Sequence, residues 1–206
     1  PFEVIVGAIL TQSAAWTNVE KAIANLKKAG KLSPDALRRL PEAELARLVH
    51  PCGYYNVKAR KLKAFAGWFG EQYDDSLDKL FAQDIDDLRY RLLAVYGIGE
   101  ETADSIILYA GNKPVFIIDA YTRRIIDRLG ISPHPNSYPA YQKLFMTHLP
   151  ADAALFNEYH ALLVRLAKET CRKQPLCTQC CLNPETKAVN GPTRGRFPCA
   201  GFIQKR

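Results

Sequence analysis

The chain has 206 residues, of which 48% are hydrophobic and 24% are charged, and this composition excludes a disordered or collagen-like protein. No apolar run approaches the roughly 20 residues that a membrane-spanning helix needs. The net charge is +7, and the whole excess lies in residues 114–206, which carry 13 basic and 6 acidic side chains, whereas residues 1–113 carry 15 of each. A basic half beside a neutral one is typical either of contact with a polyanion such as nucleic acid or of a solvated basic surface.

The hydrophobic pattern is helical along nearly the whole chain, and we expect an all-α protein with short loops. Ser33 followed by Pro34 predicts the start of one helix, and Asn56 is a candidate cap for another. Apolar stripes at helical spacing are Val19-Ala22-Ile23-Leu26, Leu62-Phe65-Ala66-Phe69, Leu88-Leu92-Val95, Ala103-Ile106-Ile107-Ala110, Ile125-Ile126-Leu129 and Leu155-Tyr159-Leu162-Leu163-Leu166.

Two segments depart from this pattern. Residues 115–118 (VFII) are the only strand-like run, and they predict either a short strand or a buried connector. Residues 132–139 contain three prolines, which break helices, so we expect a loop there. The chain also begins at Pro1 inside an apolar segment, and we expect a fragment whose first helix is missing.

The most informative stretch is Gly97-Ile98-Gly99, where one helical stripe ends and another begins. Two glycines around one apolar residue permit a tight turn, the isoleucine can plug the core, and the following helix can present its backbone N–H groups to an anion. This arrangement indicates a helix-hairpin-helix that grips a nucleic-acid phosphate without reading bases. The alternative is an ordinary pair of helices joined by a glycine turn.

A single acid, Asp119, ends the apolar run 115–118 and opens a basic segment. As structure, it predicts a helix N-cap. As chemistry, a carboxylate near a phosphate grip can stabilise a sugar cation or orient a water molecule. Arg123, Arg124 and Arg128 follow and are candidate phosphate contacts. Lys58, Arg60, Lys61 and Lys63 are either phosphate contacts or a solvated face.

Five of the six cysteines lie from residue 171 onward, which favours a metal site over a disulfide framework. Cys171, Cys177 and Cys180 have metal-ligand spacing, and no histidine lies near them. Four thiolates suit a [4Fe–4S] cluster or zinc. The fourth ligand is Cys181 or Cys199, and we favour Cys199 because adjacent side chains diverge. The remaining cysteine, Cys52, is predicted to be a small buried hydrophobe.

The order of hairpin, apolar run, aspartate and cysteine cluster resembles the endonuclease III superfamily of DNA glycosylases, which carry the helix-hairpin-helix (HhH-GPD) motif. The resemblance covers essentially the whole chain, from residues 1–12 (PFEVIVGAILTQ) onward, and favours the iron–sulfur cluster over zinc. The family's last cysteine spacing is usually short, so Cys199 would require an insertion. The fold implied is all-α, with a six-helix barrel domain in residues 1–113 and a second helical domain in residues 114–206 that lacks its N-terminal helix.

The resemblance implies roles for individual residues. Asp119 matches the catalytic aspartate, Gly97 and Gly99 match the hairpin glycines that flank Ile98, and Gln12 matches the residue that fills the gap left by a flipped nucleotide. Relatives that also cleave the strand have a lysine where this chain has Glu101. A carboxylate cannot form a Schiff base, so we expect a monofunctional enzyme with weak or absent strand cleavage.

A narrower resemblance, to the 3-methyladenine DNA glycosylases of the endonuclease III type, is carried by residues 10–12 (LTQ), 53–62 (GYYNVKARKL) and 97–104 (GIGEETAD). It implies an alkylated purine as the flipped base, stacked against Trp16 and against Tyr54 or Tyr55, with Glu101 adding a negative field. For these three aromatic residues the alternative is core packing.

The expected partner is double-stranded DNA with a damaged or mismatched base, bound by a monomer in a reducing compartment, the cytoplasm or nucleoid, and away from membranes. Two other functions stay open. One is a glycosylase for mismatched thymine or uracil, or for adenine, which would also lack the lysine. The other is a catalytically silent iron–sulfur module that binds DNA.

Overall fold

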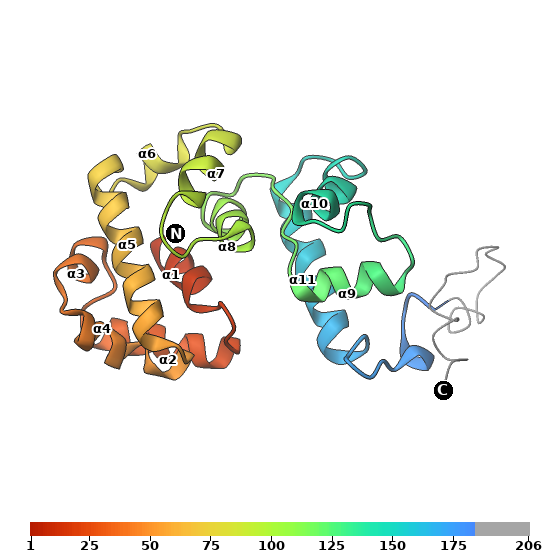
Figure 1. Cartoon of the computed structure of the whole chain (residues 1–206), viewed down its shortest axis with the longest axis horizontal. Helices are drawn as coiled ribbons and strands as arrows, with labels where there is room; N and C mark the ends of the chain where they lie inside the picture. Colours follow the sequence, from red (N-terminus) through yellow and green to blue (C-terminus); the bar gives the residue numbers. More distant parts are fainter. Residues whose placement is uncertain (184–206) are drawn as a thin grey trace. The chain divides into compact units, whose positions relative to one another are not determined.

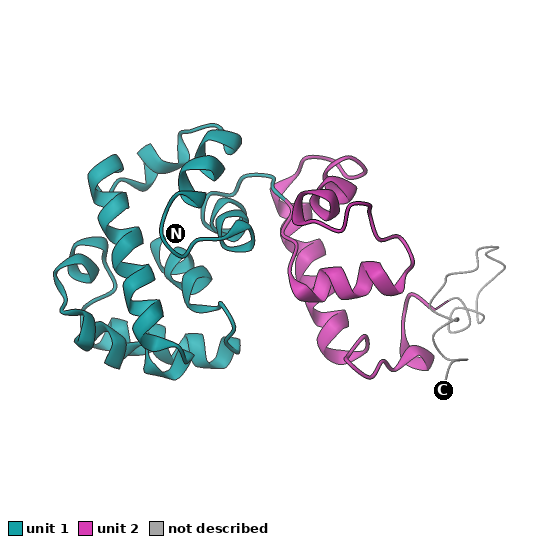
Figure 2. Ribbon diagram, in the orientation of Figure 1, with its two compact units in different colours: residues 1–115 teal, residues 116–206 magenta. Residues whose placement is uncertain are grey.

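The computed structural model describes residues 1–183, and these divide between Val115 and Phe116 into two compact units, residues 1–115 and residues 116–183 (Figure 2). Every regular element in the described residues is helical, which confirms the all-α prediction. No helix among residues 1–183 is both long enough and apolar enough to cross a membrane.

The first unit contains eight α-helices with a 3-10 turn and a π-helical turn (Figure 1). The elements are α1 (Phe2–Leu10), α2 (Trp16–Lys28), α3 (Pro34–Arg39), α4 (Glu42–Leu48), the 3-10 turn η1 (His50–Cys52), α5 (Tyr55–Tyr73), α6 (Leu77–Phe81), α7 (Ile85–Leu93), α8 (Glu100–Ser105) and the π-helical turn η2 (Ile106–Ala110). The second unit contains α9 (Ala120–Arg128), α10 (Tyr138–Met146), α11 (Ala153–Glu169) and the 3-10 turn η3 (Cys177–Gln179).

Helix α5 is the centre of the first unit, because α1, α3, α4 and α6 all pack against it. Its predicted stripe of Leu62, Phe65, Ala66 and Phe69 is fully buried. The cap expected at Asn56 is wrong. The helix begins at Tyr55, because Gly53 and Tyr54 both take positive φ angles, of 64° and 46°, and turn the chain before it reaches Asn56.

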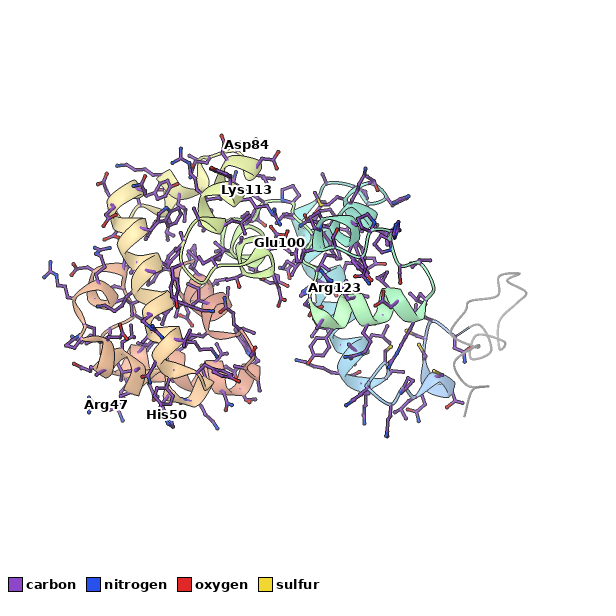
Figure 3. All side chains as sticks on the ribbon, viewed as in Figure 1. Arg47, His50, Asp84, Glu100, Lys113 and Arg123 are labelled. Carbon is purple, nitrogen blue, oxygen red and sulfur yellow. The ribbon has the colours of Figure 1, made fainter. Side chains whose placement is uncertain are left out.

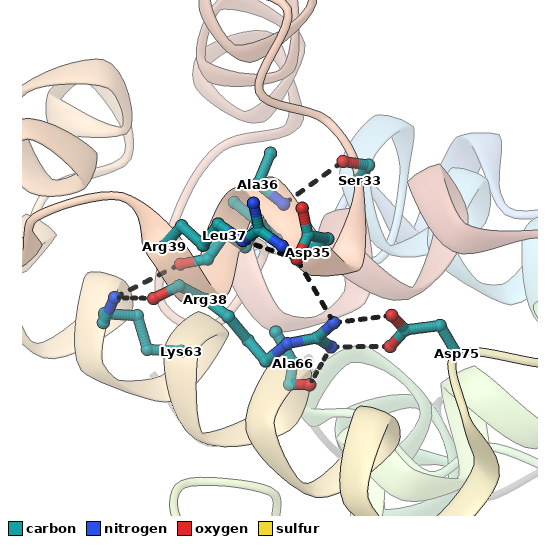
Figure 4. Close-up of polar contacts among 9 residues, drawn as sticks. All are labelled: Ser33, Asp35, Ala36, Leu37, Arg38, Arg39, Lys63, Ala66 and Asp75. Atoms are coloured by element: carbon teal, nitrogen blue, oxygen red, sulfur yellow. Dashed lines mark hydrogen bonds and ion pairs between the residues drawn. The ribbon is translucent and has the colours of Figure 1, made fainter.

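Helix α3 begins as predicted, with the Ser33 side chain accepting a hydrogen bond from the Ala36 N–H and Pro34 in the first turn. Its far end is fixed to α5 by two cations (Figure 4). Arg38 donates to the Ala66 carbonyl at 2.8 Å and to both oxygens of Asp75 at 2.6 Å. This hydrogen-bonded pair lowers the pKa of the Asp75 carboxyl. The Lys63 ammonium donates to the last carbonyls of α3, which is where a cation stabilises a helix end.

A buried ion pair joins α7 to α8. Arg89 Nε donates to Asp104 Oδ1 at 2.7 Å, and the Asp104 side chain is completely buried. Glu100, which lies at the start of α8 (Figure 3), reaches the same guanidinium at 3.5 Å. The two helices that flank the glycine turn are therefore held together by charge as well as by their apolar faces.

The second unit begins with the run 116–118, which is a buried connector and not a strand. The loop predicted for residues 132–139 ends earlier than expected. Tyr138 and Pro139 already belong to α10, because proline is tolerated in the first helical turn.

Helix α11 is rotated relative to the predicted stripe. Its buried residues are Phe156, His160, Leu163 and Ala167, whereas Leu155, Tyr159 and Leu162 lie at the surface. Phe116 packs edge to face against both Phe156 and Tyr159 of this helix, at centroid distances of 5.4 and 5.7 Å. The rotation turns His160 inward.

We expect Arg89→Met to lower the free energy of unfolding by about 3 kcal/mol, because it leaves the buried Asp104 carboxylate without its cation. Denaturant titration measures the change. Lys79→Met is the matched control, because Lys79 forms an exposed ion pair with Asp74 that contributes little. Similar losses for both variants would contradict the assignment.

Candidate functional site

The glycine turn between α7 and α8 has the geometry of a compact hairpin. Gly97 has a φ of +82°, a conformation that favours glycine, and Ile98 is buried in the core as predicted. Gly99 is the N-cap of α8 and has no side chain with which to cap the N–H groups that follow. Glu101 lies exposed in the first turn of α8. This helix start therefore offers backbone donors to an approaching anion.

Gln12, expected to enter DNA, is bound to the hairpin in this structure. Its Nε2 donates to the Gly97 carbonyl at 2.9 Å and to Thr102 Oγ1 at 2.8 Å. Lys61 of α5 donates to Gln12 Oε1. One side chain after α1 thus connects the glycine turn, the first turn of α8 and the central helix.

The four basic residues of α5 do not form a solvated face as a group, because three of them bind protein oxygen atoms. Lys58 is 2% exposed and donates to the Cys52 carbonyl at 2.7 Å, and its burial lowers its pKa. Lys61 binds Gln12, and its aliphatic stem covers Gly97. Lys63 binds the end of α3, and Arg60 lies near Glu42 at the surface, at 4.0 Å.

Two of the three predicted pocket aromatics are exposed. Trp16 is 52% exposed, lies against Gly7, and donates its indole N–H to Glu20 at 2.9 Å. Tyr54 is 73% exposed and sits in the left-handed conformation. Tyr55 instead packs on the His50 ring at a centroid distance of 4.6 Å. Tyr55 is half-buried against an exposed histidine and lies outside the core, and Trp16 and Tyr54 are exposed, so core packing accounts for none of the three.

Asp119 is the N-cap of α9, as predicted. Its Oδ1 accepts a hydrogen bond from the Thr122 N–H at 2.7 Å, and its side chain is only 14% exposed. Its Oδ2 lies 3.6 Å from Nε2 of His160, a residue of α11 that sequence reasoning missed. The spacing of Phe156, His160, Leu163 and Ala167 is an alternative helical stripe, and reading it would have placed His160 inside.

The charge of Asp119 is set by opposing effects. Burial raises the pKa of its carboxyl, but His160 and the Thr122 N–H outweigh burial, so that the pKa lies below the usual 3.8. Asp119 is therefore ionised at neutral pH. Because its folded pKa is depressed, its contribution to stability is present above the usual carboxyl pKa and is lost as pH falls through the folded value.

The three arginines of α9 have different surroundings. Arg123, labelled in Figure 3, lies over the Tyr141 ring at 5.0 Å. Arg124 donates to the carbonyls of Ala167 and Cys171, and Arg128 donates to Cys171 and to Arg172. Arg124 and Arg128 thus bind the end of α11 and the loop after it, which leaves Arg123 as the better candidate for a phosphate contact.

Three of the predicted ligands, Cys171, Cys177 and Cys180, line one cavity together with Arg128 and Leu176. Arg128 Nη1 lies 3.3 Å from Cys171 Sγ. Burial and the neighbouring thiols of Cys181 and Cys171 raise the pKa of Cys180.

Within residues 1–183, no group of three His, Cys, Asp or Glu side chains is close enough to hold a metal ion as the thiols stand. Cys199 lies outside the described residues. The thiols that are described share a cavity and a soft donor set, which fits a thiolate-bound metal centre once they converge. Cys52 lies apart from them, is 3% exposed, and has a thiol pKa raised by burial, as predicted for a small hydrophobe.

Residues 6–151 match the HhH-GPD superfamily of base excision DNA repair proteins. A candidate DNA repair glycosylase of Methanocaldococcus jannaschii is 42% identical over 181 residues, which cover 87% of this chain and 82% of that protein. Endonuclease III of Sulfolobus acidocaldarius is 28% identical over 188 residues, covering 90% and 81%.

Solved structures give the same picture. The Helicobacter pylori 3-methyladenine DNA glycosylase, crystallised with 1,N6-ethenoadenine, aligns with a TM-score of 0.71 and 28% identity over 82% of this chain and 85% of that one. An endonuclease III trapped covalently on DNA aligns with a TM-score of 0.76 over 91% and 86%, and at 22% identity it shows the shared fold alone.

The two hairpin glycines should respond differently to alanine. Gly97→Ala should lower the free energy of unfolding by about 1–3 kcal/mol, because alanine is strained at positive φ and its Cβ would overlap the Lys61 stem. Gly99→Ala should cost less than about 1 kcal/mol, because its φ is −97° and nothing lies within 4 Å of an added Cβ. Thermal or denaturant unfolding compares them, and equal losses would contradict this account.

Proposed function

Because the chain belongs to the HhH-GPD superfamily of base excision DNA repair proteins, we propose that it is a monofunctional DNA glycosylase that releases an alkylated purine such as 3-methyladenine. The observation that carries the proposal is Asp119, a buried carboxylate kept ionised at the start of a helix. The finer substrate is favoured by two exposed aromatics and by the 3-methyladenine glycosylase among the structural relatives.

In this proposal the bond between sugar C1′ and the base nitrogen breaks, and the base leaves with the electron pair. Asp119 then has two roles. Its negative charge stabilises the developing oxocarbenium ion, and its carboxylate takes the proton from the water as the water oxygen bonds to C1′. An alkylated purine is cationic before cleavage and leaves as a neutral base, so it needs little help from a general acid.

The first unit would bind the DNA backbone. A phosphate would bind the N–H groups at the start of α8, where Gly99 leaves room for close approach. Gln12 would keep this turn in shape through Gly97 and Thr102, and it would have to release those contacts in order to fill the gap of a flipped nucleotide. Arg123 would add a backbone contact from α9.

The flipped base would stack on Trp16 or Tyr54. Exposing a large aromatic ring to water is unfavourable, and a cationic base would cover such a ring with a cation–π contact of about 0.5–2 kcal/mol. Glu101, exposed on α8, would add a negative field. It also occupies the position at which strand-cleaving relatives carry a lysine, so the proposed enzyme uses water and not an amine.

We further propose that Cys171, Cys177, Cys180 and Cys199 hold a [4Fe–4S] cluster. The shared cavity of the first three thiols, whose lining includes no histidine, supports this assignment. A cluster there would stabilise the folded loop after α11 and would take no part in base release.

Base release from a panel of duplexes tests the function. Wild type should release methylated purines, leave strands that break only after alkali, and lose activity by at least about a hundredfold in Asp119→Asn, because that variant lacks the charge opposite the sugar cation. Release of thymine from G·T, of uracil from G·U, or of adenine opposite oxidised guanine would contradict the alkylated-purine substrate and identify a different base as the substrate. Strand breaks without alkali would contradict the monofunctional proposal.

Metal analysis tests the cluster. Protein purified without oxygen should be brown and contain about four iron atoms per chain. Cys171→Ala should lose most of this iron, whereas Cys52→Ala should keep it because Cys52 is buried in the other unit. Cys181→Ala should also keep its iron, whereas Cys199→Ala should lose it. If instead Cys181→Ala loses iron and Cys199→Ala keeps it, the fourth ligand is Cys181. Colourless protein with zinc would refute the cluster.

A further inference from the structure

His160 and Asp119 face each other inside the second unit. Helix α11 packs against α9, and the contact joins Nε2 of His160 to Oδ2 of Asp119 at 3.6 Å. The two side chains are only 10% and 14% exposed. A buried imidazole directed at a buried carboxylate is not needed for apolar packing, and its neighbours on the same face of α11 are Phe156, Leu163 and Ala167.

We propose that His160 is a positioning residue that holds the Asp119 carboxylate through its second oxygen in the orientation required at the sugar. The inference rests on the proposed role of Asp119 in base release. His160 acts only through Asp119, and it is not assigned a contact with the substrate.

The two oxygens of Asp119 have different partners, and this fixes the plane of the carboxylate. Oδ1 is bound by the Thr122 N–H at 2.7 Å, and Oδ2 faces His160. Each oxygen has a second lone pair, which stays available for a sugar cation or a water molecule. Catalytic hydrogen bonds are often long without substrate and tighten when the substrate binds, so the 3.6 Å contact between His160 Nε2 and Asp119 Oδ2 can become a hydrogen bond in the complex with DNA.

The other ionisable side chains on the neighbouring elements have contacts elsewhere. Arg123 stacks on Tyr141, and Tyr141 donates to Asp127. Arg124 binds carbonyls at the end of α11. The groups that act on the pKa of Asp119 are His160 and Thr122, and both lower it against the effect of burial. Removing the imidazole should therefore raise this pKa.

The test uses His160→Leu, which removes the donor, and His160→Gln, which keeps an N–H donor without a charge. His148→Leu is the matched control, because His148 is an exposed histidine of the same unit. Single-turnover base release is measured against pH on the duplex that wild type cleaves fastest, and DNA affinity is measured separately.

His160→Leu should lower the single-turnover rate about 10- to 100-fold, the usual range for residues that orient a functional group from behind. Its DNA affinity should stay within about twofold of wild type, and the acid limb of its pH profile should move to higher pH. His160→Gln should recover most of the rate, and His148→Leu should match wild type. A purely structural role would lower the rate without moving the acid limb.

The outcomes separate this inference from the proposed function. If Asp119→Asn keeps full activity, the proposed function fails. If Asp119→Asn is inactive while His160→Leu keeps the wild-type rate and acid limb, only the role of His160 fails. Carbon-13 NMR titration of the Asp119 carboxyl gives a readout without activity: an unchanged pKa in His160→Leu overturns the inference. If the leucine variant does not fold, the same titration on His160→Gln decides, because this variant also lacks the imidazole that lowers the pKa of Asp119, so that pKa should still rise.

Discussion

A carboxylate that is buried and still charged must have donors supplied by the protein, and the candidate chemistry of this chain depends on that constraint. Asp119 accepts a hydrogen bond from a backbone N–H of its own helix, and an imidazole nitrogen of α11 lies 3.6 Å from its second oxygen. The backbone donor follows directly from the position of Asp119, because the side chain of an N-cap residue accepts a hydrogen bond from the first turn of its helix. The imidazole contact requires α11 to be rotated so that His160 points inward, on the same buried face as Phe156 and Leu163.

The hairpin of the first unit meets the opposite requirement, because it keeps donors uncovered. A serine or aspartate at the N-cap of α8 would bind the first N–H groups of that helix, whereas Gly99 leaves them for an incoming anion. The turn must then be held by other means. The Arg89–Asp104 pair fixes the two helices, and Gln12 binds the Gly97 carbonyl from outside the hairpin. Rigidity is thus supplied by residues that do not occupy the anion site.

Local signals in the sequence predicted the features that depend on a few adjacent residues. Asp119 after an apolar run gave an N-cap, and Gly97-Ile98-Gly99 gave the hairpin with its buried isoleucine. Features that depend on tertiary contacts were missed. His160 required knowing which of two stripes on α11 is buried, because each stripe contains a residue that packs on Phe116. The oxygen partners of Lys61 and Lys63 lie far along the chain, whereas the partner of Lys58 is the nearby Cys52 carbonyl. The cap at Asn56 failed because a left-handed turn at Gly53 and Tyr54 starts the helix first.

The surroundings of the lysines on α5 bear on whether an amine could replace water in base release. An amine nucleophile must be unprotonated and must reach sugar C1′. Burial lowers the pKa of Lys58, which favours the neutral amine, but Lys58 is 2% exposed and its Nζ binds the Cys52 carbonyl. Lys63 is held by three carbonyls at the end of α3, and Lys61 binds Gln12 while its stem covers Gly97. Each of these amines would have to break structural contacts before reaching a sugar. These contacts support the proposal that water, and not an amine, attacks the sugar.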